Sequence, residues 1–307
     1  MRRATGSLKL KYYEITGLGG LRVWRRLEQR WGVERLFTVA RAYYLCRATL
    51  NELTKWPPKW RDEPAWLKIS HSLPARIRRR MQRYLNTLAQ SFPDRLTRPE
   101  WISLCRLEGV EHLQAARQAG RPVVLVFFHF GPILNLRQWV QAHGFRAAAL
   151  VGGDAKSRGR LMLFQDSLSP FPEIPQVFYP HQLKALTKFV KDGNMLFIAV
   201  DLRDGRQTSA TIEGWWTAKI NSGAARLANN TGADLILCST INEDFWRFRI
   251  KFHPPIPGET LRTEADVEEA NRRLLEMMVP EFKAYPEQVV LPILWQRPEI
   301  ILPTGPF

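Results

Sequence analysis

The sequence lacks a long uninterrupted hydrophobic segment. Its most apolar uncharged stretch, Pro122 to Leu136, is broken by His129, Gly131 and Pro132, whereas a helix that spans a bilayer needs about 20 apolar residues. The opening MRRATGSLKLKYYEITGLGG is basic, but it has no apolar core of the kind found in signal peptides. We therefore expect neither a membrane-spanning helix nor a secretory leader.

Cysteine is also scarce. Cys46, Cys105 and Cys238 are far apart and form no CxxC pair, so the sequence supports neither a disulfide framework nor a zinc site. The stretch GGDAKS does not meet the GxxxxGK[ST] spacing of a phosphate-binding loop. These absences favour a soluble or peripheral protein of a reducing compartment.

Acidic residues are few in the first third of the chain. Residues 1–100 hold 22 Lys and Arg against 8 Asp and Glu, a net charge of +14, whereas the other 207 residues hold 23 against 21, a net charge of +2. Such asymmetry predicts an anionic partner, either a membrane surface or a nucleic acid. We judge nucleic acid the less favoured partner, because no helix-turn-helix, zinc-finger or RNP pattern accompanies the charge.

This basic third is expected to be helical. In ARIRRRMQRYLNTLAQSF the apolar residues share one helical face: Ile77, Met81, Tyr84, Leu85, Leu88 and Phe92. The arginines between them fit either a surface helix with a solvated basic face or an amphipathic helix near anionic lipid. Upstream, Trp56, Trp60 and Trp66 lie among prolines and suit either a membrane interface or ordinary packing.

From about residue 107 short apolar runs alternate with helical patterns. Six of these runs are predicted to be strands: Val123–Phe128, Ala147–Val151, Gln176–Tyr179, Leu196–Val200, Leu235–Cys238 and Trp246–Phe252. The helical patterns lie at Gln182–Asp192, Ser222–Asn230 and Ala265–Lys283. The alternation predicts an α/β domain over residues 107–307, with a mainly parallel sheet covered by helices. Residues 1–106 then form a basic helical part that packs on this domain or covers its groove.

His129 and Asp201 stand out as candidate site residues. Each follows a predicted strand, and ligands of parallel sheets bind beyond the carboxyl ends of the strands. A histidine there can accept a proton from a hydroxyl at neutral pH, and an aspartate can orient the ring. Alternatively, His129 only bonds a backbone group and Asp201 only opens a turn. Gly131 suits a tight turn, and Pro132 suits the first position of the next helix.

Several stretches carry a family resemblance. LEGVEHLQAARQAGRPVVLVFFHFG, GNMLFIAVDLRDGR, GWWTAKINSGAARLANNTGADLILC, HPPI and AYPEQVVLPILW resemble, in this order, segments of the bacterial lipid A biosynthesis acyltransferases, the late lauroyl- and myristoyl-transferases. The matches cover about residues 107 to 296. The resemblance implies a glycerolipid-acyltransferase type of fold, with a mixed sheet, surrounding helices and a groove at His129.

The sequence departs from the motif of this family at one important position. The family has a histidine, four residues, and then Glu or Asp, and the resemblance gives that acid the task of activating the histidine. In this sequence the position holds Leu134, which can neither accept the ring N–H nor stabilise an imidazolium, while the adjacent Asn135 can form a hydrogen bond without a charge. Asp201 is the candidate for the missing acid.

Basic loop residues are candidates for substrate binding. Arg203 and Arg206 follow Asp201, and Lys156, Arg158 and Arg160 lie in an earlier loop. Arginine binds phosphate in a bidentate manner, although basic loop residues are also often simply solvated.

Together these features predict an acyltransferase at the inner face of the cell membrane, cytoplasmic and peripheral. It would move a fatty acyl group from an acyl carrier protein or coenzyme A thioester to a hydroxyl or amine of a lipid-like acceptor. His129 would be the general base, and no metal or cofactor is expected. The alternative is a non-catalytic relative that binds lipid, an acyl chain or a partner enzyme, which the leucine at position 134 favours.

Overall fold

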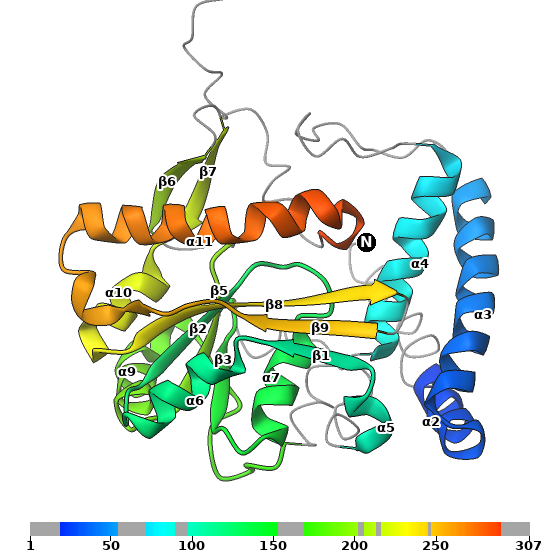
Figure 1. The fold of residues 1–307 in the computed structure, drawn as a ribbon, viewed down its shortest axis with the longest axis horizontal. Helices are drawn as coiled ribbons and strands as arrows, with labels where there is room; N and C mark the ends of the chain where they lie inside the picture. The colour runs from blue at the N-terminus through cyan, green and yellow to red at the C-terminus, as the bar shows by residue number, and fades with distance from the viewer. Residues whose placement is uncertain are drawn as a thin grey trace, which may run out of the picture.

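A computed structural model gives the fold of residues 19–54, 72–89, 98–152, 169–201, 206–212, 216–244 and 247–289 (Figure 1). Its helices are α2 (Gly19–Trp31), α3 (Val33–Thr54), α4 (Leu73–Ala89), α5 (Pro99–Ile102), α6 (Val110–Gln118), α7 (Leu134–Ala142), α9 (Leu183–Lys191), α10 (Gly223–Thr231), α11 (Glu264–Ala284) and the short 3₁₀ helices η5 (Pro180–Gln182), η6 (Gly258–Thr260) and η7 (Pro286–Gln288). Among these residues, every helix is too short or too polar to cross a bilayer.

The strands form one large sheet and a separate hairpin. They are β1 (Cys105–Glu108), β2 (Val123–Phe127), β3 (Ala147–Leu150), β4 (Val177–Phe178), β5 (Met195–Ala199), β6 (Gln207–Ile212), β7 (Trp216–Asn221), β8 (Asp234–Asp244), β9 (Arg247–Phe252) and β10 (Ile256–Pro257). The sheet has the order β1-β9-β8-β2-β5-β3-β4, with β10 also paired to β8, and β6 pairs with β7. Strands β8, β2, β5, β3 and β4 are parallel neighbours, whereas β9 and β10 run antiparallel to β8. The predicted mixed, largely parallel sheet flanked by helices is therefore confirmed.

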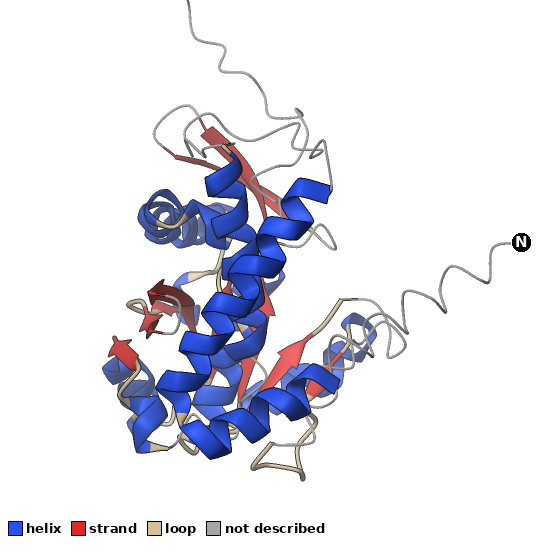
Figure 2. Cartoon of the chain, turned by 90° about the vertical axis from the view of Figure 1, so that its right-hand side faces the viewer, coloured by secondary structure: helices blue, strands red, loops and turns tan. Residues whose placement is uncertain are grey.

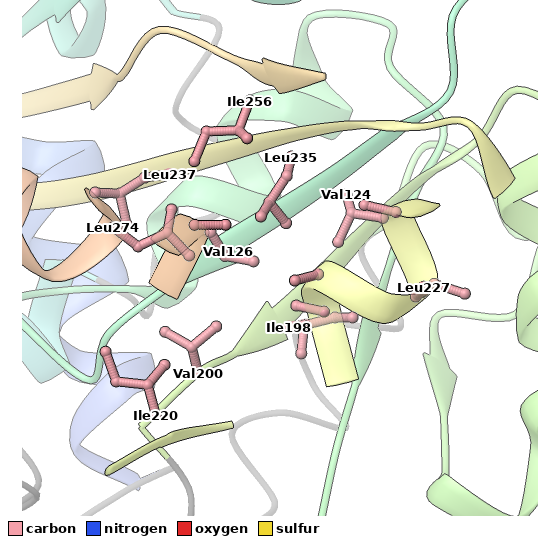
Figure 3. Close-up of a cluster of buried hydrophobic side chains, with 14 of the residues drawn as sticks. Val124, Val126, Ile198, Val200, Ile220, Leu227, Leu235, Leu237, Ile256 and Leu274 are labelled. Atoms are coloured by element: carbon pink, nitrogen blue, oxygen red, sulfur yellow. The ribbon is translucent and has the colours of Figure 1, made fainter. Parts of the chain in front are cut away.

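Alternating side chains of the central strands pack into two separate layers, as expected for strands buried on both faces. On one face Val124 and Val126 of β2 join the apolar faces of α9, α10 and α11 (Figure 3). On the other face Val123 and Leu125 pack with residues of α6 and α7. This double burial explains why β2 and β5 appear in the sequence as continuous apolar runs.

The N-terminal helices form a third packing unit beside the antiparallel edge of the sheet. Leu36 and Phe37 of α3 and Leu85 of α4 pack with Trp101 of α5 and Phe248 of β9. In Figure 1, α4 lies between α3 and the sheet, and Figure 2 looks at the side of the molecule that these helices cover. The predicted helical character of this part is confirmed within residues 19–54 and 72–89. The proposed division between residues 106 and 107 falls inside β1 and stays a prediction.

The basic face of α4 is solvated only in part: Arg78 is exposed, but other arginines of the helix are buried, so the interpretation of a solvated basic face was partly wrong. Arg76 and Arg79 are 6% and 5% exposed. Glu52 of α3 accepts a hydrogen bond of 3.0 Å from Arg76 and pairs with Arg80. Burial opposes ionisation of Glu52, but the hydrogen bonds from Arg80 and Arg76 outweigh it and hold the pKa of the carboxyl below its ordinary value. Trp56, Trp60 and Trp66 lie outside the described residues.

Some strands were not foreseen. The hairpin β6–β7 and the edge strand β1 have short, mixed sequences without a clear apolar run, so their pairing depends on tertiary neighbours. One such neighbour is Asn271 of α11, whose amide nitrogen donates a 2.5 Å hydrogen bond to Thr208 of β6. Strand β8 also continues beyond the predicted Cys238, to Asp244, because β9 pairs with this extension.

Candidate active site

The register of two parallel strands brings His129 and Asp201 together. Strand β2 pairs with β5 so that Phe127 lies opposite Ala199, and His129 and Asp201 each follow two residues later. Both chains therefore emerge at the same carboxyl edge of the sheet, where ligands of such sheets bind. The predicted meeting of the two residues at one edge is confirmed by their contacts.

Asp201 holds His129 at two points. One carboxylate oxygen, Oδ1, lies 2.6 Å from Nδ1 of the imidazole, and the other, Oδ2, accepts the backbone N–H of His129 at 2.7 Å. The Asp201 side chain is 2% exposed and that of His129 is 21% exposed. The carboxylate is thus buried and fully engaged with one residue, while part of the ring remains open to solvent.

This contact selects the tautomer of His129. An ionised carboxylate can only accept hydrogen bonds, so Nδ1 must carry the proton that it shares with Asp201. The other ring nitrogen, Nε2, then has a free lone pair in the neutral ring. Within the part of the chain that the structure describes, Nε2 makes no hydrogen bond. The arrangement can accept a proton at Nε2 and stabilise the resulting imidazolium through Asp201.

The acid of this pair follows strand β5, whereas the acid position of the family motif, Leu134, is the first residue of helix α7. Leu134 and Asn135 are the first two residues of α7, and the helix begins at Leu134, two residues later than the predicted start at Pro132. The alternative in which Asp201 only opens a turn was wrong, because its carboxylate is buried against His129. A substrate contact by Asn135 stays a prediction.

Gly131 shapes the loop between His129 and α7. Its φ of +62° lies in the left-handed region, and a Cβ at this position would lie 2.0 Å from the backbone oxygen of Thr240. Any other residue would therefore both strain the backbone and collide with β8. The predicted tight turn is confirmed, while a direct contact of Gly131 with substrate stays a prediction.

Gln288 clamps this loop to β8, and the sequence reasoning missed it. Its backbone oxygen accepts the N–H of Gly131 at 2.8 Å. Its side chain accepts the backbone N–H of Asn242 at 2.9 Å and donates to the backbone oxygen of Asn242 at 2.7 Å. The next residue, Val289, forms a β-bridge with Phe130. Gln288 lies in the stretch AYPEQVV, which resembles the closing segment of the lipid A acyltransferases but does not indicate a contact with Gly131.

The clamp continues into the N-terminal helices. The side-chain nitrogen of Asn242 donates to Oδ1 of Asn86 in α4 at 3.3 Å, and Gln82 donates to the same oxygen at 3.1 Å. All four amide side chains, including that of Gln288, are at most 8% exposed. A buried polar chain therefore connects α4 to the loop that follows His129.

The predicted basic contacts are only partly described. Arg203, Lys156, Arg158 and Arg160 lie outside the described residues, so their substrate-binding roles stay predictions. Arg206 is 67% exposed, and its guanidinium lies 3.4 Å from the carboxylate of Glu264. Its predicted role in binding phosphate also stays a prediction. Among the residues that the structure covers, no group of three or more His, Cys, Asp and Glu could hold a metal ion.

Comparisons with known proteins add little at the sequence level. No protein-family model and no curated protein matches this chain. Among solved structures, the chain is similar to the 1-acyl-sn-glycerophosphate acyltransferase PlsC from Thermotoga maritima, with 13% identity and a TM-score of 0.36. The match covers 71% of this chain and 86% of that one. The resemblance to the lipid A acyltransferases therefore stays an interpretation of the sequence motifs.

Proposed function

We propose that this protein is an acyltransferase in which His129 is the general base and Asp201 is its orienting acid. The observation that carries the proposal is the two-point contact of Asp201 with the ring and the backbone N–H of His129. It fixes both the orientation and the tautomer of the imidazole, which are the two requirements of a base in acyl transfer. A histidine that only fills space needs neither.

The chemistry follows from the free Nε2. This atom removes the proton from a hydroxyl or amine of the acceptor, and the acceptor oxygen or nitrogen attacks the carbonyl carbon of an acyl thioester. The tetrahedral intermediate then collapses, the carbon–sulfur bond breaks, and the thiolate leaves with the proton that the imidazolium returns. Asp201 remains ionised and stabilises the imidazolium throughout.

The substrates of the proposed reaction are inferred from the sequence motifs. Five stretches in family order resemble lipid A acyltransferases, which supports a fatty acyl thioester of acyl carrier protein or coenzyme A as the donor. The same resemblance supports a lipid-like acceptor with a hydroxyl or amine, reached from the cytoplasmic side of the membrane.

The direct test is thioester consumption by the purified full-length chain. Acyl carrier protein and coenzyme A thioesters are offered with lysophospholipid, lipid A precursor and small-molecule acceptors, and free thiol is measured. His129→Ala should reduce the rate by about 10²- to 10⁴-fold, the usual contribution of a general base. The matched control is His181→Ala, because His181 is an exposed histidine on η5 and its loss should leave the rate unchanged.

The second candidate is a non-catalytic protein that binds an acyl chain or lipid. It is favoured by Leu134, which stands where the family has an acid. If no thioester is consumed with any acceptor while acyl chains still bind, this candidate replaces the enzyme. Turnover that depends on His129 rejects it.

A further inference from the structure

Exposed apolar side chains gather on the first two described helices. Among the residues that the structure describes, nine large hydrophobic side chains are exposed, and most of them belong to α2 and α3: Val23, Trp31, Val39, Tyr43, Leu45, Leu50 and Leu53. Leu50 and Leu53 are 64% and 60% exposed. Single exposed hydrophobic residues are ordinary, but a concentration on one element marks an interaction surface.

On α3 these residues form a continuous stripe. Val39, Tyr43, Leu50 and Leu53 are separated by four, seven and three residues, so they lie along one side of the helix. The side of α3 that carries Leu36, Phe37, Ala40, Tyr44 and Ala48 is buried against α4 and its neighbours. We call the exposed stripe, together with Arg35, the α3 outer face.

The charged residues around the stripe are mainly basic. Residues 19–54 contain seven arginines and three glutamates. Arg26, Arg30, Arg35 and Arg41 are exposed, whereas Glu28 and Glu52 are each 5% exposed. Glu34 is therefore the one exposed acid on these two helices. Arg35 lies four residues before Val39 and therefore on the side of α3 that carries the stripe. An apolar stripe on a helix with a basic excess is the pattern of a helix that lies in a lipid interface.

We propose that the α3 outer face docks onto an anionic phospholipid surface, with the leucines in the acyl boundary and Arg35 at the headgroups. A second copy of the chain fits this face poorly, because α2 and α3 carry seven arginines against three glutamates and two copies of them would repel each other. The α3 outer face includes no residue of the His129 site, so lipid docking and the proposed reaction can each fail without the other. It also moves the predicted lipid contact away from α4, whose Arg76 and Arg79 are buried.

The experiment is co-sedimentation of the full-length protein with vesicles of phosphatidylcholine alone or of phosphatidylcholine mixed with phosphatidylglycerol. We expect binding to the mixed vesicles and much less to the neutral ones. Raising the salt should weaken it, because charges farther apart than about 10 Å are screened at 0.1 M salt. Equal binding to both vesicle types at low salt, or to neither, would overturn the proposal.

Two matched variants locate the contact. Leu50→Ser with Leu53→Ser should lower the partition constant by about 100-fold or more, since two leucine side chains that enter the acyl boundary are lost. Leu183→Ser is the control, because Leu183 on α9 is 63% exposed but lies outside α2 and α3. Circular dichroism should show the same helix content for all three proteins. If the control loses as much binding as the double variant, the α3 outer face is not the contact.

The oligomeric state of the lipid-free protein tests whether a second copy of the chain covers this face. Sedimentation velocity should give a monomer at every concentration for wild type and variants. A concentration-dependent dimer that Leu50→Ser with Leu53→Ser abolishes would assign the α3 outer face to a second copy instead and overturn the lipid proposal.

Discussion

Two histidines follow buried strands in this molecule, and their surroundings are opposite. His129 follows β2 and meets the carboxylate of Asp201, with part of its ring open. His253 follows β9, which runs antiparallel to β8 and so ends at the other edge of the sheet. His253 is 4% exposed, and among the described residues its Nε2 has no hydrogen-bond partner.

The charges near the two rings explain the difference in their capacity for chemistry. Burial, followed by the positive charges of Lys251 and Arg249 and by His112, lowers the pKa of His253 to about 4. His253 is therefore neutral at physiological pH and has no route to a stabilised imidazolium. A strand end alone does not make a base. A carboxylate from the parallel neighbour and an accessible nitrogen do.

The largest effect on stability should come from the hydrogen bonds by which Gln288 ties the loop after His129 to β8. Gln288→Ala removes the two hydrogen bonds that the Gln288 side chain makes with the backbone N–H and oxygen of Asn242, and losing a buried hydrogen-bond partner costs about 1–3 kcal/mol. We expect the free energy of unfolding to fall by about 2–4 kcal/mol in urea denaturation. The rate of thioester consumption should fall as well, because residue 288 keeps its backbone bond to Gly131 but loses the side-chain bonds that tie it to β8.

An exposed glutamine provides the control for this variant. Gln114→Ala on α6 should change the free energy of unfolding by less than about 0.5 kcal/mol. If both glutamine variants denature at the same urea concentration, Gln288 contributes no more to the free energy of unfolding than a surface residue does. The contacts of its side chain would then not hold the loop that follows His129.

The next effect is a dependence of stability on pH from His253. Its pKa is about 4 in the folded chain and near 6.5 in an unfolded one. The unfolded chain therefore takes up this proton first as the pH falls from about 6.5 to 4, and the folded state loses stability over that window. Each unit of pKa difference corresponds to about 1.4 kcal/mol.

His253→Gln should remove this contribution, since glutamine does not titrate. Glu281 and Glu287 have pKa values raised first by burial and act in the opposite direction, so the quantity to measure is the difference between wild type and variant. Urea denaturation from pH 4 to 7 should show a flatter decline on the acid side for the variant. Parallel curves would mean that His253 is not a buried neutral histidine, and the contrast with His129 would disappear.

The smallest effect is expected from restoring the acid of the family motif. Both donors that face Asp201, Nδ1 and the backbone N–H of His129, already have partners, so a second carboxylate has nothing left to orient. Leu134→Glu should leave the rate of thioester consumption within about 3-fold of wild type. This change is small beside the contribution of a general base, which is usually about 10²- to 10⁴-fold. A gain of 10-fold or more would show that Asp201 is an incomplete substitute.

The core of the site could be predicted from the sequence because it depends on local runs. Val123–Phe128 and Leu196–Val200 are apolar enough to be neighbouring parallel strands, and polar residues that follow such strands meet at one edge. His129 and Asp201 each come directly after one of these runs, so both are expected at that edge. The same logic gives the parallel sheet and its helices.

The rest depends on partners that are distant in the sequence. The counterion of Arg76 is Glu52, which lies 24 residues earlier on another helix, so the charge pattern of α4 alone indicated a solvated face. Gln288 forms hydrogen bonds with backbone groups of Gly131 and Asn242, and a residue pattern does not predict bonds to backbone groups. The short strands β6 and β7 take their shape from α11, not from their own periodicity.

The rate of Asp201→Asn tests the central claim most directly. An asparagine can accept the backbone N–H of His129 with its oxygen, but its NH₂ group must then donate to Nδ1. That reverses the tautomer, and Nε2 carries the proton and can no longer act as a base. We predict that kcat/KM for thioester consumption falls by about 10²- to 10⁴-fold in a folded protein. A rate within about 3-fold of wild type, in an enzyme that still depends on His129, would contradict the assignment of Asp201 as the acid of the site.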